Sequence, residues 1–279
     1  MAESEEEQTI RRILVALDAS PHSLAALKLA AELAARLDAE LIGIYVEDIN
    51  LLRLAELQIS REVGSHSARV SEIDSQHIQR QLRAQARRAR QALALLAESA
   101  DVRWSFRTTR GLIPMELLSA TDEADLVILG KAGWSKRKQL GSTAQTLVVQ
   151  SSRHTLIIQS GIRMRRPLMV IYDGSEAGKK ALETALTLRE ADNPFIILIS
   201  AESAEELNRL QADIQEWAKH TGAKPEYRWL TAVDEAAIAR QVWSVGCGIL
   251  VLPAESEFLP SEELLELLNE TNCAVFLVR

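Results

Sequence analysis

The chain has only two cysteines among its 279 residues, Cys247 and Cys273, and each lies beside an apolar run. A scaffold held together by disulfides needs more cysteines than this, so both are expected to be buried thiols. Aromatic residues make up only 4% of the chain, which leaves aliphatic side chains to fill the core. No apolar run approaches the roughly 20 residues that a membrane helix needs, and this argues against a membrane protein.

A positive net charge is also lacking. The formal net charge is −7, which argues against nucleic acid as the main partner. Residues 1–162 hold 20 basic and 20 acidic side chains, whereas residues 163–279 hold 12 basic and 19 acidic ones. A polyanionic ligand is therefore expected to prefer the first half of the chain.

Patterns typical of catalysis are sparse as well. The five histidines are scattered, with no metal-ligand spacing and no readable nucleophile–base pair, and no P-loop is present. The sequence therefore favours a binding protein over an enzyme and predicts no metal site. The first residues, MAESEEEQ, lack the basic-then-apolar plan of a signal peptide. We expect residues 1–10 to be a disordered acidic tail on a cytoplasmic protein.

What the sequence does contain is a regular alternation of short apolar runs and helical patterns. The first run ends at Asp18, and Ser20 followed by Pro21 is a strong helix-start signal. Strands are expected at 13–17, 41–46, 102–108, 126–129 and 156–158. A long, arginine-rich helical insertion is predicted between residues 50 and 100, divided near residues 63–65. Its arginines, from Arg80 to Arg90, are interpreted as a solvated helix face.

The same alternation restarts after residues 161–167. The turn Asp173-Gly174-Ser175 repeats Asp18-Ala19-Ser20 at an offset of 155 residues. Five further strands are expected at 168–172, 195–199, 227–230, 249–252 and 274–278. We therefore predict an internal duplication: two tandem α/β domains, each with a five-stranded parallel sheet covered by helices. The predicted division is a first domain at 11–160, a linker at 161–167 and a second domain at 168–279.

A glycine-rich loop follows the fourth strand of the first half. Gly130, Gly133 and Gly141 are spread over twelve residues, and Ser142 and Thr143 follow as good helix-start residues. Such a loop at the carboxyl end of a parallel strand is where open α/β sheets bind ligands, and free amides at a helix start favour anions. Four basic residues, Lys131, Lys136, Arg137 and Lys138, favour a phosphate ligand. A ligand-free turn with a solvated basic surface remains the alternative.

These features together resemble a tandem member of the universal stress protein family, over nearly the whole length. The resemblance rests on the acidic residue in ILVALDAS, on Arg110-Gly111 after the third strand, and on the glycine-rich loop. Nucleotide-binding members of that family have nine residues between the second and third glycines, whereas this chain has seven. The resemblance implies Rossmann-like domains of the adenine nucleotide alpha hydrolase type.

The resemblance also implies site residues for an adenine nucleotide, whether ATP, ADP or AMP, with Mg²⁺ as a companion of ATP. Asp18, with Ala16 beside it, would contact the adenine or ribose edge, and the main chain at Val46 would contact and recognise the adenine. The remaining site residues would wrap the ribose and first phosphates (Leu129, Gly130 and Gly133) and hold the outer phosphates (Gly141, Ser142 and Thr143). Alternatively, Asp18 caps the first helix and the glycines only turn the chain.

The second half keeps the acidic turn but not the loop. Its fourth strand is followed by Pro253-Ala254-Glu255-Ser256-Glu257, which has no glycine and carries two carboxylates. Proline lacks an amide donor and the carboxylates repel phosphate, so we expect a structural or partner-binding copy. The resemblance further implies that the halves pair through their last strands, 155–159 and 274–279, as a pseudo-two-fold internal dimer. Further dimerisation and a protein partner stay open.

Three functions are compatible with these features. The leading one is a cytoplasmic stress-response regulator that binds an adenine nucleotide in its first half. A nucleotide-independent interaction module, in which the shortened loop has lost the ligand, is the second. A slow ATP hydrolase is the third, although no general base is evident from the sequence.

Overall fold

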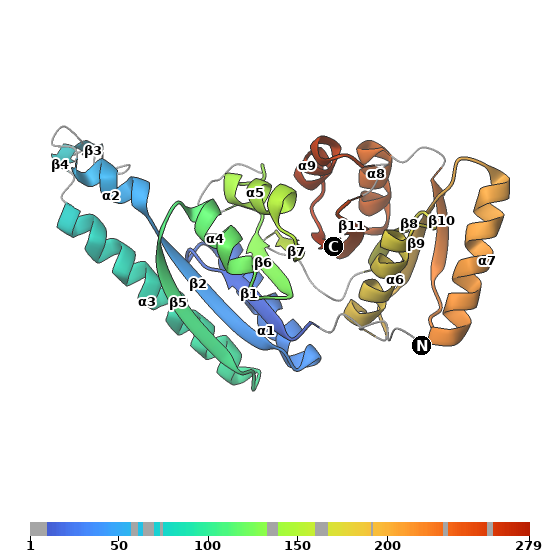
Figure 1. Ribbon diagram of the computed structural model, residues 1–279, viewed down its shortest axis with the longest axis horizontal. Helices are drawn as coiled ribbons and strands as arrows, with labels where there is room; N and C mark the ends of the chain where they lie inside the picture. The colour runs from blue at the N-terminus through green and yellow to red at the C-terminus, as the bar shows by residue number, and fades with distance from the viewer. Residues whose placement is uncertain are drawn as a thin grey trace, which may run out of the picture.

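The computed structural model describes residues 10–56, 61–63, 70–72, 75–132, 139–159, 167–190, 192–230, 234–255 and 259–279. Its central feature is one ten-stranded sheet that runs through both halves, with helices on both faces (Figure 1). The first half supplies the strands β1 (Arg12–Ala16), β2 (Glu40–Asp48), β5 (Trp104–Gly111), β6 (Leu126–Gly130) and β7 (His154–Ile158). The second half supplies β8 (Leu168–Tyr172), β9 (Phe195–Ser200), β10 (Glu226–Leu230), β11 (Ile249–Pro253) and β12 (Ala274–Val278).

The strand order is β10-β9-β8-β11-β12-β7-β6-β1-β2-β5. All neighbours within a half are parallel, and the two halves meet where β12 and β7 pair antiparallel, with Phe276 opposite Leu156. The predicted α/β fold with five parallel strands per half is therefore confirmed. The last strands of the two halves do pair, and they do so edge to edge, which makes the two sheets one.

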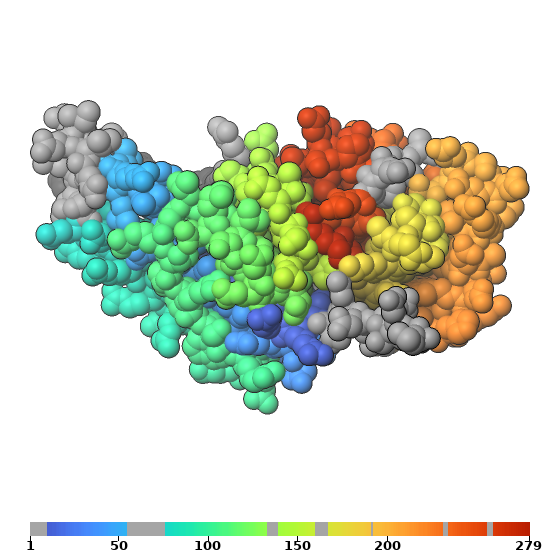
Figure 2. Space-filling model, viewed as in Figure 1, coloured from blue at the N-terminus to red at the C-terminus, as the bar shows by residue number. Residues whose placement is uncertain are grey.

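Helices cover the sheet in two layers. The helices are α1 (Pro21–Leu37), α2 (Ile49–Glu56), α3 (Ser75–Ser99), α4 (Ile113–Thr121), α5 (Ser142–Gln150), α6 (Glu176–Leu188), α7 (Ala204–Thr221), α8 (Glu235–Val245) and α9 (Ser261–Glu270). Helices α1, α3, α6 and α7 pack on one face, and α4, α5, α8 and α9 on the other. Both apolar layers continue across the junction of the halves. In Figure 2, α5 and α9 meet at this junction.

Local signals explain most helix starts. Ser20 caps α1, with its hydroxyl accepting from the Ser23 amide and Pro21 as the first helical residue. In the second half, Ser175 caps α6 in the same way by accepting from the Gly178 amide. The repeated turn at an offset of 155 residues is thus a repeated helix cap.

The insertion between β2 and β5 differs from the prediction. Two helices, α2 and α3, were expected there and are present, but a short antiparallel hairpin, β3 (Arg61–Val63) with β4 (Val70–Glu72), lies between them. Strands of three residues are too short to show an alternating pattern, which is why the sequence did not reveal them. The arginines of α3 are exposed, as predicted, and Arg90 stacks over the Trp104 ring at 5.7 Å.

Several other predictions can be compared with the described residues. Cys247 and Cys273 are both buried and free, which confirms the expectation of buried thiols. Residues 1–9 of the expected tail and 161–166 of the expected linker lie outside the described residues, so the domain bounds stay predictions. Ile10, at the end of that tail, is buried. Within the described part of the chain, no helix has both the length and the hydrophobicity for a bilayer crossing.

Candidate functional site

The candidate site lies at the carboxyl ends of β1 and β6. From β1 the chain adds β2 and β5 on one side, and it later returns to add β6 and β7 on the other. The boundary between β1 and β6 is therefore a topological switch point, where the loops that follow the two strands diverge and leave a crevice. The loops concerned are the Asp18 turn before α1 and the glycine-rich loop before α5.

A cavity of about 340 Å³ occupies this crevice. Eight of the nine predicted site residues line it: Ala16, Asp18, Val46, Leu129, Gly130, Gly141, Ser142 and Thr143. The ninth, Gly133, lies outside the described residues, as do Lys136, Arg137 and Lys138. Residues that are up to 127 positions apart in the sequence, from Ala16 to Thr143, thus line the same cavity.

One wall of the cavity is apolar. Ile44 and Val46 reach it from β2, Leu129 from β6, and Ile113 and Leu117 from α4. Such a wall suits a flat, weakly polar group such as a nucleobase, because burying apolar surface on both partners is favourable. Ile44, Ile113 and Leu117 were not predicted as site residues. The covering of β2 by α4 could have suggested them, since that packing is usual in βαβ units.

The Asp18 turn forms a polar corner of the cavity. Asp18 Oδ1 accepts from the Ser20 amide at 2.9 Å, and Ala19 between them has a φ of 57°. The helix itself is capped by Ser20, so the alternative in which Asp18 caps α1 is not what the structure has. Asp18 instead holds the turn, and its side chain lines the cavity together with those of Ser20 and Ser23.

Glycines form the opposite rim. A Cβ at Gly130 would lie 2.8 Å from the Cβ of His22, so only glycine lets β6 end this close to α1. Gly141 is the N-cap of α5, supplies no side-chain cap, and donates its amide to the Lys131 carbonyl at 2.9 Å. The first turn of α5, with Ser142 and Thr143, therefore faces the cavity with a helix N-terminus, which favours an anion.

Lys131 does not take the expected place. It was grouped with the basic residues that would meet a phosphate, but its ammonium is buried and donates to the carbonyls of Thr271 at 2.9 Å and Asn269 at 3.1 Å. Desolvation by this burial lowers the pKa of Lys131. The prediction for Lys131 was wrong because its partners lie 138 and 140 residues further along the chain.

Arg110 and Gly111, the second motif, lie at the end of the edge strand β5. Arg110 forms an ion pair with Glu47 of β2 at 2.7 Å. A Cβ at Gly111 would come within 2.3 Å of Glu116 Oε1. This motif therefore fixes the end of β5 against β2 and the start of α4, which carries the apolar wall of the cavity.

The comparisons with known proteins agree with this fold. The model of the universal stress protein family matches residues 9–159, which is more than half of the chain. The chain belongs to the universal stress protein family. A comparison with curated proteins gave no match.

Among the solved structures that resemble this universal stress protein, two match it over nearly its whole length. One is a universal stress protein from Archaeoglobus fulgidus DSM 4304, with a TM-score of 0.73, 16% identity and 96% of each chain covered. The other is a protein of unknown function from Pseudomonas aeruginosa PAO1, with a TM-score of 0.62 and 14% identity, covering 97% of this chain and 93% of that one. At such identities the likeness shows the shared tandem fold alone.

The second half of this universal stress protein has a different crevice. The counterpart of Ala16 is Ile171, which is fully buried and pairs with Leu198 as Ala16 pairs with Ile44. A larger cavity of about 610 Å³ does lie near the second acidic turn, but Asp173, Asp213 and Glu255 line it together with Arg209. Three carboxylates against one guanidinium make this cavity unsuited to a polyphosphate.

Proposed function

We propose that this universal stress protein is a regulatory protein that binds one adenine nucleotide in the cavity between β1 and β6. The observation that carries the proposal is the cavity itself, which unites an apolar wall, the Asp18 corner and the N-terminus of α5. These three parts match the three parts of a nucleotide: base, ribose and phosphates.

The cavity also suggests a role for each lining group. The base would lie against Ile44, Val46 and Leu117, and the Asp18 carboxylate would accept from a ribose hydroxyl or the amino group of adenine. The phosphates would lie at the start of α5, near Gly141 and Ser142. If ATP brings Mg²⁺, phosphate oxygens and water would hold the ion. Among the described residues, no three histidine, cysteine, aspartate or glutamate side chains are grouped as metal ligands.

A binding role is favoured over hydrolysis by the composition of the lining. Among the described lining residues, Asp18 is the single carboxylate and no histidine is present. The Asp18 carboxylate already accepts from the Ser20 amide, on the side of the cavity formed by α1. Activation of a water molecule at the phosphates needs a base within hydrogen-bond reach of that water, and the α5 side of the described lining offers serine and threonine only.

Mass spectrometry of ligand released from freshly purified, denatured protein tests the proposal. The expected result is an adenine nucleotide at close to one equivalent per chain, or stoichiometric uptake when ligand-free protein is supplied with ATP, ADP or AMP. The loop is two residues shorter than in nucleotide-binding members of the family, so it makes few contacts with the outer phosphate of ATP. ADP is therefore expected to bind about as well as ATP. Absence of any binding at millimolar nucleotide would favour the interaction module instead.

A further inference from the structure

Asn269, in the last turn of α9, contacts the glycine-rich loop of the other half of the molecule. Its side-chain Oδ1 accepts from the amide of Leu140 at 2.7 Å, and its main-chain carbonyl accepts from Lys131 Nζ at 3.1 Å. Lys131 and Leu140 lie on the two sides of the loop, each next to the last described residue on its side. The Gly141 amide donates to the Lys131 carbonyl at 2.9 Å and joins these two sides to each other. One residue of the second half therefore holds both flanks of the loop.

These contacts are part-buried: Asn269 is itself exposed, whereas the two residues that it contacts are buried. Lys131 and Leu140 are 5% and 4% exposed, so a donor that loses its partner at either position has little access to water in its place. The Lys131 ammonium also donates to the Thr271 carbonyl at 2.9 Å and to Gln159 Oε1 at 3.5 Å. It thereby caps the C-terminal end of α9, where carbonyl groups carry partial negative charge.

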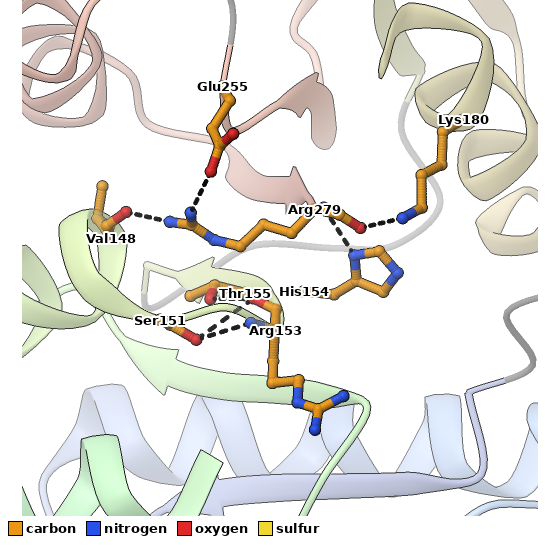
Figure 3. A network of polar contacts seen from close by, with 8 residues as sticks. All are labelled: Val148, Ser151, Arg153, His154, Thr155, Lys180, Glu255 and Arg279. Atoms are coloured by element: carbon orange, nitrogen blue, oxygen red, sulfur yellow. Dashed lines mark hydrogen bonds and ion pairs between the residues drawn. The ribbon is translucent and has the colours of Figure 1, made fainter. Parts of the chain in front are cut away.

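The other side of the junction has a related but simpler contact. Figure 3 shows the guanidinium of Arg279, at the end of the chain, directed at the Val148 carbonyl in the last turn of α5 and at Glu255, 3.9 Å away. Each half thus supplies a cation to the C-terminal turn of a helix in the other half. The hydrogen bond from the Leu140 amide to the Asn269 side chain lies beside Lys131, next to the cavity between β1 and β6.

We propose that Asn269 is a positioning residue of the cavity: the second half holds Lys131 and Leu140, which flank the glycine-rich loop, and with them the start of α5, in the conformation that accepts a ligand. This inference rests on the proposed function for the identity of the ligand, and on the Asn269 contacts for the positioning. The half without a phosphate loop thereby gains a role at the site, and ligand binding is coupled to the packing of α9 against α5.

The test compares the full-length chain with the variants Asn269→Ala, Asn269→Asp and Glu266→Ala. Asn269→Ala removes the acceptor for the Leu140 amide, Asn269→Asp keeps an oxygen there, and Glu266→Ala changes an exposed residue one turn earlier in the same helix. The first readout, amide hydrogen exchange of the ligand-free protein, follows the peptide that covers residues 139–147. The second readout is the affinity for ADP in a calorimetric titration.

We expect Asn269→Ala to accelerate exchange at residue 140 about tenfold or more, with β6 and β12 unchanged. Its affinity for ADP should fall about fivefold or more, because the conformation that accepts the ligand loses the stabilisation of one hydrogen bond to the amide of a buried residue. Asn269→Asp should stay within about twofold of the unchanged protein in both readouts. Glu266→Ala should give the same exchange rate and affinity as the unchanged protein.

Unchanged exchange at residues 139–147 in Asn269→Ala would overturn the inference, whether or not a nucleotide binds. If the unchanged protein binds ADP, equal affinities in the unchanged protein and Asn269→Ala would also overturn it. Failure of Asn269→Asp to restore the slow exchange and the affinity would show that Asn269 only fills space. If the unchanged protein binds no nucleotide, the proposed function fails, and the exchange experiment still decides whether Asn269 positions the loop.

Discussion

Ala16 lies at the carboxyl end of β1, where the cavity opens. Its counterpart in the second half, Ile171, occupies the equivalent position with a side chain three carbon atoms larger. The strand registers are otherwise alike, so the size of this one side chain is a physical reason why the first half has room for a base. The sequence could reveal this contrast only after the repeat had been aligned.

Exchanging Ala16 for the residue of the second half is therefore a sharp test. Ala16→Ile should lower nucleotide affinity about tenfold or more, because the added carbons occupy the space of the ligand. The free energy of unfolding should change by less than about 1 kcal/mol, since the cavity accepts the added volume without repacking. Calorimetric titration and urea denaturation measure the two quantities. Undiminished binding by Ala16→Ile would place the ligand elsewhere.

His154, at the start of β7, has a side chain that is 7% exposed and an Nδ1 atom that accepts from the Arg279 amide at 3.0 Å (Figure 3). Desolvation lowers the pKa of His154 to about 4, aided by nearby Lys180, Arg279 and Arg153 and opposed by Asp125. The neutral ring is thus the form that the folded protein needs. A protonated Nδ1 would lose its acceptor role and lie among like charges.

The lowered pKa of His154 makes a prediction about acid. Because the folded-state pKa lies below the unfolded value near 6.5, the unfolded chain binds more protons between these values. The contribution to stability is complete above pH 6.5 and is lost as the pH falls towards 4, by up to about 3 kcal/mol. His154→Gln offers an amide that does not titrate. Denaturation midpoints at pH 7 and pH 4.5 should differ less in this variant than in the unchanged protein, and equal differences would contradict the assignment.

At the scale of elements, the strands were the most predictable part of the structure. Apolar runs such as LMVIY and AVFLV match β8 and β12 residue for residue, because strands buried on both faces admit little else. The cavity-lining glycines were likewise predictable, since a glycine after such a run marks a turn at the ligand edge. The contacts of Lys131 and Asn269 were not, because they depend on how the halves dock and not on any local pattern.

Strand β7 makes a further prediction as an element. In the intact chain its two edges pair with β6 and β12, and Leu156, Ile157 and Ile158 are all buried. A fragment of residues 1–160 would expose the β12 side of this strand, and an apolar edge without a partner pairs with another copy. We expect the fragment to be a dimer in light scattering, with a melting temperature that rises with its concentration. A stable monomer that melts like the intact chain would contradict the role of β7 as the junction.

At the scale of the whole molecule, the duplication yields one continuous sheet whose two halves differ in charge and in the lining of their cavities. The first half has balanced charge and a cavity with a helix N-terminus at its rim, whereas the second half carries the acidic excess and a cavity lined by carboxylates. The second half also supplies Asn269 to the loop of the first. An internal dimer that began with two equal sites would in this way retain one site and the scaffold that supports it.

The number of nucleotides bound per chain tests this asymmetry most directly. Calorimetric titration of the ligand-free, full-length protein with ADP should give a stoichiometry close to one. The affinity should fall about tenfold or more in Ala16→Ile and stay unchanged in Asp173→Ala of the second half. A stoichiometry of two, or loss of binding in Asp173→Ala with binding retained in Ala16→Ile, would contradict the account.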